Sequence, residues 1–538
     1  MDNFEGSLNS TAYFMKQILA FISLTALVFG MFSCQPLKTS NEKIEVVSKE
    51  YATPYFEDST RIDKIKKAAP IVDSIFSSYA RTNHNPAIAY GIVADGQLIY
   101  TGNVGYSNVE RKILASSNSR FRIASMTKSF TAMAILKLRD EGKLQLSDPA
   151  ANYIQEMKNL KYPTSDASVI TIFHLLTMSA GFPEDNPWGD RQLSDTDEDL
   201  LKLMKEGASF SNNPGAEFEY SNLGYALLGK IIGNVSGKSY QEYVTENILR
   251  PLGMNDCGFE YTSMPQEKLA IGYRWEDERW KAEELLKDGS YAAMGGMICT
   301  IDDFAKYMSF LLSATPPQNA TETGPVVRRS AREMQQPWKF RVLAPNRGSR
   351  TGELCPQTGS YGFGLGWKVD CHGTSTVSHS GGLPGFGSVH QLLPEFGIGV
   401  VAFSNLTYAN MGTPVSNVVD TLIYLADLKK RVFPVSPILK NTQKNLMKAM
   451  TNWDEQYDGL FAENFFPDKS KDRWKKETTE LFSKIGTIKN VSPMQSENLL
   501  RGTFTITGEK GELEIFFTLT PETKPTIQEL DVSVKSPK

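Results

Sequence analysis

The chain has few of the residues that usually bind metal ions. Its 538 residues include five cysteines and five histidines. It contains neither an HExxH motif nor a pair of CxxC motifs, which are the patterns typical of zinc sites. The histidines are scattered along the chain, at His84, His174, His372, His379 and His390. The sequence therefore predicts no metal site and no cofactor.

The chain also lacks an excess of positive charge. Its formal net charge is -4 and its pI is about 5.9, so no nucleic-acid partner is indicated. With 41% hydrophobic and 22% charged residues, the composition is typical of a globular protein. A length of 538 residues leaves room for a large core and for more than one domain.

A long apolar run occurs near the N-terminus, in the segment MKQILAFISLTALVFGMFSCQ. It begins with a basic residue, Lys16, and continues through Ile18–Phe32. The run is short for a membrane-spanning helix and suits a signal peptide, with residues 1–14 as an upstream extension. We therefore expect residues 1–34 to be an export signal and the mature protein to lie in the cell envelope.

The apolar run ends at Ser33-Cys34-Gln35, which resembles the lipidation site of bacterial lipoproteins. Met31 and Phe32 depart from the usual pattern of that site, so cleavage of a plain signal peptide nearby is the alternative. Lipidation of Cys34 would anchor the protein to a membrane without a spanning helix. The polar residues 35–60 would then be a tether.

The remaining cysteines are free to form disulfides in an exported protein. Four cysteines allow three pairings, and the sequence does not choose among them. They are Cys257, Cys299, Cys355 and Cys371.

Two regions of predicted strands flank a region of predicted helices within residues 61–432. Asp95-Gly96 separates two apolar runs and predicts a β-hairpin, whereas residues 165–290 are predicted to be mostly helical. Between Tyr361 and Leu406, apolar strands joined by short turns predict an antiparallel meander, and a helix over Val415–Leu428 follows. An antiparallel sheet built from distant segments, with helices inserted, predicts an α+β fold.

The C-terminal residues 441–538 follow a linker-like segment and have their own order of predicted helices and strands. We expect helices over Asn441–Phe466 and near Trp474–Ile485, then strands on either side of Gly508–Gly511. This order predicts a small separate α+β domain, with a weak analogy to the cystatin or NTF2-like folds. No catalytic constellation is recognisable in it.

Ser125 and Lys128 are the first candidate catalytic residues. They stand three residues apart in FRIASMTKSFTAMAILKLRDEG and would share one face of a helix. A serine hydroxyl becomes a good nucleophile when a neighbouring base removes its proton, and burial can lower the pKa of a lysine until it is such a base. The helix N-terminus would also direct N–H groups at Ser125. A helix cap beside a solvated lysine is the alternative, since S-x-x-K also occurs at Ser40–Lys43.

Two further motifs follow in the chain. Tyr220-Ser221-Asn222 precedes a predicted helix; Tyr220 could transfer protons and Asn222 could hold a substrate carbonyl. The alternative is a packed aromatic residue before a capped helix. The motif His379-Ser380-Gly381-Gly382 lies in a strand pattern, where glycines often mark the close approach of a ligand or another backbone. The alternative there is a turn of small residues after an edge strand.

The order of these three segments resembles the serine β-lactamase-related family. The connecting segments ITIFHLLTMSAGF, ILRPLGM, AAMGGMICTIDDFAKYM and YGFGLGW carry the same resemblance, which covers Ile71–Leu428. The family includes class C β-lactamases, D-Ala-D-Ala carboxypeptidases, D-aminopeptidases and β-lactamase-like esterases. The resemblance implies a penicillin-recognising fold with its site between the sheet and the helical region.

The resemblance also implies a role for each motif residue. Ser125 would be the acylated nucleophile. Lys128 and Tyr220 would share proton transfer, with the identity of the general base left open. Asn222 would orient the substrate amide. The backbone N–H groups of Ser125 and Gly382 would form the oxyanion hole.

Two residues depart from the β-lactamase pattern. His379 stands where β-lactamases have the lysine of K-T-G, so a permanent positive charge near a substrate carboxylate is missing. Gly382 lacks the hydroxyl that some relatives use to bind that carboxylate. A G-x-S-x-G motif is absent from the sequence, which argues against an α/β-hydrolase.

The sequence thus predicts an exported serine hydrolase that works through an acyl-enzyme at Ser125. Its substrates would be small esters, D-amino-acid amides or peptidoglycan-like peptides. Three alternatives remain: a class C-like β-lactamase, a catalytically silent envelope sensor on the same fold, and a biological role set by the C-terminal domain. The sequence leaves the oligomeric state open.

Overall fold

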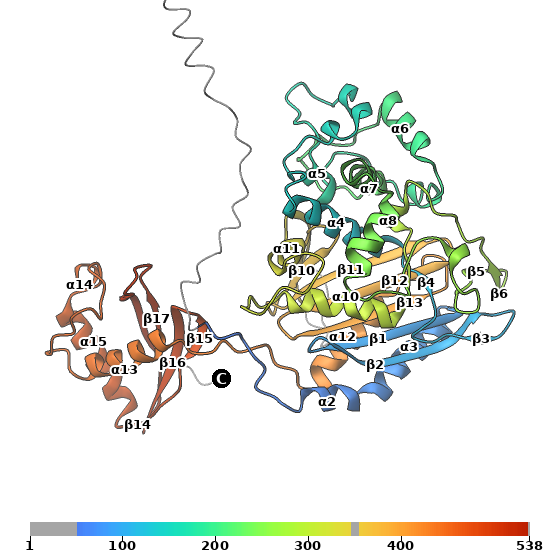
Figure 1. The fold of residues 1–538 in the computed structure, drawn as a ribbon. Helices are drawn as coiled ribbons and strands as arrows, with labels where there is room; N and C mark the ends of the chain where they lie inside the picture. Colours follow the sequence, from blue (N-terminus) through green and yellow to red (C-terminus); the bar gives the residue numbers. More distant parts are fainter. Residues whose placement is uncertain (1–50, 346–353, 536–538) are drawn as a thin grey trace, which may run out of the picture. The chain divides into compact units, whose positions relative to one another are not determined.

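The structure is a computed structural model that describes residues 51–345 and 354–535 (Figure 1). Within these residues, a nine-stranded sheet has the order β3-β2-β1-β13-β12-β11-β10-β9-β8. All its neighbouring strands are antiparallel, and strands from the two ends of the sequence meet where β1 pairs with β13. The strands are β1 Ala87–Ala94, β2 Gln97–Asn108, β3 Ile113–Leu114, β8 Lys339–Ala344, β9 Gln357–Tyr361, β10 Gly366–Asp370, β11 Ser375–Leu383, β12 Phe386–Leu393 and β13 Ile398–Ser404.

Helices cover both faces of this sheet. Along β1, successive side chains point to opposite faces: Ala89 belongs to one hydrophobic cluster, and Ile88 and Ile92 belong to another. Strands β1, β12 and β13 are buried at every residue, which explains why their sequences are almost continuously apolar. The predicted hairpin is confirmed, because β1 and β2 are joined at Asp95 and Gly96, both with positive φ.

The two helical layers come from different parts of the chain. The N-terminal helices α2 and α3 pack with α12 against one face, whereas α4 and α10 belong to the cluster on the other face. This combination of an antiparallel sheet with helices confirms the α+β class. The helices of these layers are α2 Arg61–Lys67, α3 Ala69–Thr82, α4 Lys128–Asp140, α10 Ile301–Ser313, α11 Arg328–Met334 and α12 Gly412–Leu425.

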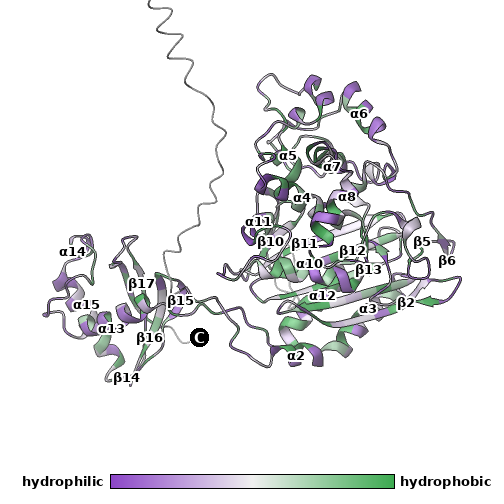
Figure 2. Cartoon of the chain, in the orientation of Figure 1, coloured by the Kyte–Doolittle hydropathy of each residue, from purple (hydrophilic) through white to green (hydrophobic). Residues whose placement is uncertain are grey.

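A further group of helices lies between α4 and α10 in the sequence. Helix α7 is its centre and shows why it forms here: the Ser221 side chain caps its N-terminus, and Gly237 ends it in the left-handed conformation. Figure 2 shows hydrophobic residues along α7 and hydrophilic residues along the peripheral α6. The helices are α5 Ile172–Leu176, α6 Asp197–Glu206, α7 Asn222–Ser236, α8 Tyr240–Val244 and α9 Ala292–Gly295.

Residues 165–290 are less helical than the sequence pattern predicted. A β-hairpin of β5, Tyr273–Glu276, and β6, Arg279–Ala282, interrupts them. Its strands are largely exposed and form a two-stranded sheet of their own, with one further bridge from Tyr273 to Leu406, so they lack the buried alternation that would mark them in the sequence. The pairing of the cysteines is now fixed: Cys257 bonds Cys299 and Cys355 bonds Cys371.

The C-terminal residues form a five-stranded antiparallel sheet with helices and a hydrophobic cluster of their own. The expected helix over Asn441–Phe466 is wrong in its length, since α13 ends at Thr451 and Asn452 leaves the helical conformation. The separate-domain boundary and the cystatin or NTF2-like analogy stay predictions. The elements are α13 Pro437–Thr451, α14 Phe465–Asp468, α15 Lys471–Ile485, β14 Ile488–Val491, β15 Gln495–Asn498, β16 Arg501–Gly508, β17 Glu512–Leu519 and β18 Ile527–Val534.

The predicted export signal lies outside the described residues. Residues 1–34, the lipidation candidate Cys34 and most of the tether 35–60 precede residue 51, where the description begins. In residues 51–345 and 354–535, the search for a helix of sufficient length and hydrophobicity to span a membrane finds none.

Candidate active site

Ser125 sits at the junction of a short strand and a helix. Strand β4, Phe121–Arg122, pairs with β7, Ile298–Cys299, and a 3-10 turn, Ala124–Thr127, then leads into α4. Ala124 has a φ of 49°, an unfavourable conformation for a residue with a side chain and one that clusters at functional sites. The nucleophile candidate is therefore held by a constrained turn between two rigid elements.

Lys128 is fully buried, and its amine contacts three acceptors. Its Nζ lies 3.0 Å from Ser125 Oγ, 2.7 Å from Asn222 Oδ1 and 2.8 Å from the carbonyl oxygen of Met294. The Asn222 and Met294 oxygens can only accept hydrogen bonds. When Lys128 is neutral, its two N–H bonds are directed at these oxygens, and its lone pair is left facing Ser125 Oγ. The geometry suits removal of the serine proton.

The environment of Lys128 favours this neutral form. Burial lowers its pKa from 10.5 to about 7, while Asp190, Asp185 and Glu184 oppose the shift by raising it. Desolvation outweighs these carboxylates because an ammonium ion loses its hydration shell in the interior. A lysine with a pKa near neutrality can act as a base at physiological pH.

Asn222 holds the lysine rather than facing the cavity. The residue is fully buried, its Oδ1 accepts from Lys128, and its Nδ2 donates to Asn186 Oδ1 at 2.6 Å. Asp185 fixes the segment by accepting from the backbone N–H groups of Asn222 and Leu223, at 2.7 and 2.8 Å. Both ends of the Asn222 amide are bonded to protein groups in this structure, and the expectation that Asn222 orients a substrate amide stays a prediction.

Tyr220 lines the cavity beside Ser125. The Lys128 Nζ lies 4.9 Å from the centre of the Tyr220 ring. Burial raises the pKa of Tyr220 well above its usual value, and the nearby Asp190 and Asp185 act in the same direction. The Ser125 side chain acts to lower this pKa, but its effect is smaller than that of burial. Tyr220 is therefore a neutral phenol that donates protons more readily than it accepts them.

His379 lies on β11 as a neutral imidazole. Its Nδ1 lies 2.6 Å from the Ser380 carbonyl oxygen, which can only accept, so Nδ1 carries the proton. Its Nε2 then accepts from the Tyr361 hydroxyl at 2.9 Å. Burial is the largest cause that lowers the pKa of His379 to about 3, and the charge of Lys128 adds to it. His379 thus brings no positive charge to the cavity.

The two glycines after His379 have different surroundings. A Cβ at Gly381 would lie 2.3 Å from the Ile123 carbonyl oxygen, so only glycine allows β11 to approach the segment before Ser125. Gly382 lines the cavity, and a Cβ there would meet a Tyr408 ring carbon at 2.9 Å. Gly381 therefore positions the strand, and Gly382 forms part of the cavity wall.

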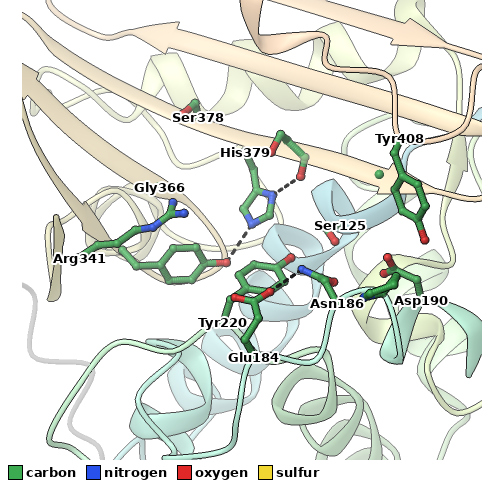
Figure 3. Close-up of a pocket in the computed structure, with 14 residues that line it drawn as sticks. Ser125, Glu184, Asn186, Asp190, Tyr220, Arg341, Gly366, Ser378, His379 and Tyr408 are labelled. Atoms are coloured by element: carbon green, nitrogen blue, oxygen red, sulfur yellow. Dashed lines mark hydrogen bonds between the residues drawn. The ribbon is translucent and has the colours of Figure 1, made fainter. Parts of the chain in front are cut away.

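The cavity in front of Ser125 has a volume of about 570 Å³. Figure 3 shows Ser125 between two groups of side chains, with Arg341 on one side and Asp190 with Tyr408 on the other. Several lining residues were not predicted as site residues, because they come from loops and strands outside the three catalytic motifs. They are Glu184, Asn186, Asp190, Arg341, Tyr361 and Tyr408.

A serine beside a buried lysine and a partly buried tyrosine, next to strand β11 of an antiparallel sheet, is the arrangement of the serine enzymes of the penicillin-recognising type. The family model described as Beta-lactamase matches residues 72–424. The chain belongs to the serine β-lactamase-related family, and the predicted family is confirmed.

The curated relatives match parts of this chain. Protein flp of Staphylococcus aureus (strain COL) is 32% identical over 340 residues, which are 62% of this chain and 62% of that protein. The chain thus spans less than two thirds of the length of this relative. The D-alanyl-D-alanine-carboxypeptidase/endopeptidase AmpH of Escherichia coli (strain K12) is 26% identical over 396 residues, 70% of this chain and 96% of that protein.

Solved structures of similar proteins support the fold alone. The octameric penicillin-binding protein homologue from Pyrococcus abyssi has a TM-score of 0.54 at 23% identity and covers 87% of this chain and 98% of its own. The penicillin-binding protein from Bacillus halodurans has a TM-score of 0.52 at 24% identity and covers 64% of this chain and 98% of its own.

Proposed function

We propose that the protein is a serine hydrolase that forms an acyl-enzyme at Ser125. The observation that carries this proposal is the contact of 3.0 Å between Ser125 Oγ and Lys128 Nζ. The same amine donates hydrogen bonds to Asn222 Oδ1 and to the Met294 carbonyl oxygen. The family assignment is consistent with it.

Acylation follows from this geometry. Neutral Lys128 takes the hydroxyl proton of Ser125 as Oγ attacks the carbonyl carbon of the substrate. The tetrahedral intermediate collapses, the bond to the leaving nitrogen or oxygen breaks, and Tyr220 supplies the proton that this atom needs. The Lys128 ammonium then returns its proton to Tyr220. A water molecule hydrolyses the ester by the reverse sequence of proton transfers and restores Ser125.

The pKa directions support Lys128 as the base. Lys128 has a pKa lowered to about 7, whereas burial raises the pKa of Tyr220 well above 10. At neutral pH a substantial fraction of Lys128 is uncharged and Tyr220 is protonated. Lys128 is therefore the base for acylation, and Tyr220 is the acid for the leaving group.

The oxyanion of the intermediate would bind the backbone N–H groups of Ser125 and Gly382. Both residues line the same cavity, one in the 3-10 turn before α4 and the other on β11. Losing one such donor typically costs about 3 kcal/mol of transition-state stabilisation.

We propose small esters, D-amino-acid amides and peptidoglycan-like peptides as substrates. The relative AmpH is named as a D-alanyl-D-alanine carboxypeptidase/endopeptidase, which supports the peptide class. Arg341 lines the cavity and could attract a substrate carboxylate in place of the missing K-T-G lysine. The location of these substrates, and the sequence of residues 1–34, support a role in the cell envelope with Cys34 as a lipid anchor.

A dedicated β-lactamase is the second candidate, and His379 disfavours it. The K-T-G lysine of β-lactamases is replaced by an imidazole whose pKa is lowered to about 3, so the site has no cation at that position. Rapid hydrolysis of a chromogenic cephalosporin by the wild type would favour this candidate over an esterase or peptidase.

Active-site labelling tests the proposed function. The wild type and Ser125→Ala are treated with a fluorophosphonate and with a labelled penicillin, and adducts are located by mass spectrometry. We expect the fluorophosphonate on the peptide that contains Ser125, and no adduct in Ser125→Ala. Labelling of another residue, or no labelling of folded wild type, would contradict an acyl-enzyme at Ser125 and favour a catalytically silent protein.

A further inference from the structure

Asp190 is a buried carboxylate on the cavity wall without a cationic partner. It is 3% exposed and lines the cavity, and its Oδ1, which is itself fully buried, has no hydrogen-bond partner among the described residues. Burying a carboxylate away from water is costly unless an opposite charge or a donor compensates it. Asp190 therefore has unused capacity to bind a cation.

The nearest buried cation cannot satisfy Asp190. The three protons of the Lys128 ammonium are taken up by Ser125, Asn222 and the Met294 carbonyl. Burial raises the pKa of the Asp190 carboxyl to about 6. Lys128 acts on this carboxyl only through its charge, which lowers the pKa. Arg191 next to it also acts only through its charge, and no ion pair to Asp190 is formed by the described residues.

The surroundings hold Asp190 in position at the cavity. A Cβ at Gly189 would lie 2.7 Å from the Asn222 Cβ, so glycine lets this turn press against the residue that holds Lys128. Tyr408 lines the cavity on the same side of Ser125 as Asp190 (Figure 3), and it acts to lower the pKa of the Asp190 carboxyl. Asp185 is the other charged neighbour, and its oxygens already accept two backbone N–H groups.

Glu184, the other acidic residue of the cavity wall, is a weaker candidate for binding a cation. Its side chain is exposed, it accepts from Asn186 Nδ2 at 2.9 Å, and the charge of Arg341 acts on it. Water screens an exposed carboxylate far more than a buried one. Asp190 thus has the greater capacity to discriminate between a charged and a neutral ligand.

We propose that Asp190 binds a positively charged amino group of the substrate, so that the site prefers substrates with a free ammonium group near the scissile bond. This proposal rests on the proposed serine hydrolase function. It narrows the substrate class to amino-acid amides and peptides that carry a free amine, as opposed to neutral esters and N-acylated peptides.

Substrate binding at Asp190 would also act on the catalytic lysine. The negative charge of Asp190 raises the pKa of Lys128. An ammonium group on Asp190 would cancel this effect and increase the neutral fraction of Lys128. A cationic substrate would therefore promote formation of the base that activates Ser125.

The test compares two ligands that differ only at the amine. Ser125→Ala, which cannot turn over substrate, is titrated by calorimetry with D-alanyl-D-alanine and with N-acetyl-D-alanyl-D-alanine at a pH above 7. We expect the free amine to bind about tenfold more tightly, as for a charge-assisted hydrogen bond in a buried site. The double variant Ser125→Ala/Asp190→Asn should lose this preference and keep its affinity for the acetylated ligand.

The matched control is Ser125→Ala/Glu198→Gln, which removes an exposed acid on α6, remote from the cavity lining, and should keep the preference. A second measurement needs no Asp190 variant: the two affinities of Ser125→Ala are compared at decreasing pH. We expect the preference for the free amine to disappear as the pH falls through about 6, because Asp190 is then protonated.

Equal affinity for the two ligands, a preference that persists in the Asp190 variant, or no binding of either ligand would overturn the proposal. Failure of the hydrolase function itself is recognised separately, because it would appear as wild type that the fluorophosphonate does not label.

Discussion

The buried residues behind Ser125, which we call the floor, and the residues of the cavity wall use polar groups in opposite ways. On the floor, the Lys128 amine contacts three oxygens, and both ends of the Asn222 amide bond to protein groups. On the wall, Asp190 keeps an unpaired carboxylate oxygen, and Arg341 is exposed beside the ring of Phe218. The floor is organised before substrate arrives, and the wall is left to be completed by substrate.

This difference separates the chemistry from the recognition. Preorganised donors and acceptors need no rearrangement at the moment of reaction, which is how a site stabilises a transition state. Unpaired buried charges are costly in the free protein but discriminate strongly between ligands, because the wrong ligand leaves them unpaired. Changes to the floor should therefore affect the reaction rate with all substrates, and changes to the wall should affect the choice of substrate.

Replacing the floor lysine should have the largest effect. Lys128→Met removes the base that deprotonates Ser125, and general-base catalysis typically contributes on the order of 10²- to 10⁴-fold. We expect the rate of fluorophosphonate labelling at Ser125 to fall by that range. The control Lys143→Met removes an exposed lysine that pairs with Glu141 and should label normally. A loss no greater than that of the control would show that Lys128 is not the base.

The contact between β11 and the turn before Ser125 should be the next most sensitive feature. Gly381→Ala places a Cβ 2.3 Å from the Ile123 backbone oxygen, and overpacking of this kind typically costs about 1–3 kcal/mol. Gly382→Ala meets only the Tyr408 side chain, which can move. Thermal unfolding should show a larger loss of stability for Gly381→Ala; an equal or smaller loss would contradict the described packing.

A wall substitution should shift the pH dependence without abolishing the reaction. Labelling requires neutral Lys128, so its rate rises as the pH rises through the lysine pKa. Because Asp190 raises that pKa, Asp190→Asn should move the rise to lower pH. Rates of fluorophosphonate labelling measured across the pH range test this, with Glu198→Gln as the unchanged control. A shift to higher pH would refute the stated coupling between Asp190 and Lys128.

The smallest effect is expected at His379. Since its pKa is lowered to about 3, it remains neutral over the range in which the enzyme would act. His379→Gln should therefore keep the shape of the pH–rate profile, even where the rate changes through the lost bond to Tyr361. If the rate of the wild type changed with pH near pH 6 and this change were absent in His379→Gln, the imidazole would titrate there, which would contradict the account.

The floor was more predictable from sequence than the wall, for a physical reason. Ser125 and Lys128 are linked by helical spacing, which local sequence encodes. Tyr220 and His379 were found by resemblance, and their assembly with Ser125 depends on contacts between distant segments. Asp190 lies in a short 3-10 turn and meets Tyr408, more than 200 residues away, so no periodicity or motif marks it.

The fold shows the same contrast. The hairpin at Asp95-Gly96 was encoded by local residues and was predicted. The early end of α13 at Thr451 also has a local signal, since Asn452 and the turn residues Asp458-Gly459 follow it, but the apolar spacing concealed it. The cysteine pairing required the tertiary structure, because sequence spacing alone allows all three arrangements.

The most direct test is the pKa of Lys128 itself. The protein is labelled with ¹³C at the lysine Cε, the Lys128 resonance is identified by its absence from Lys128→Met, and its chemical shift is followed against pH. We predict a midpoint near the lowered pKa of about 7. A midpoint close to the ordinary lysine value of 10.5 would mean that the amine is charged at neutral pH and cannot deprotonate Ser125.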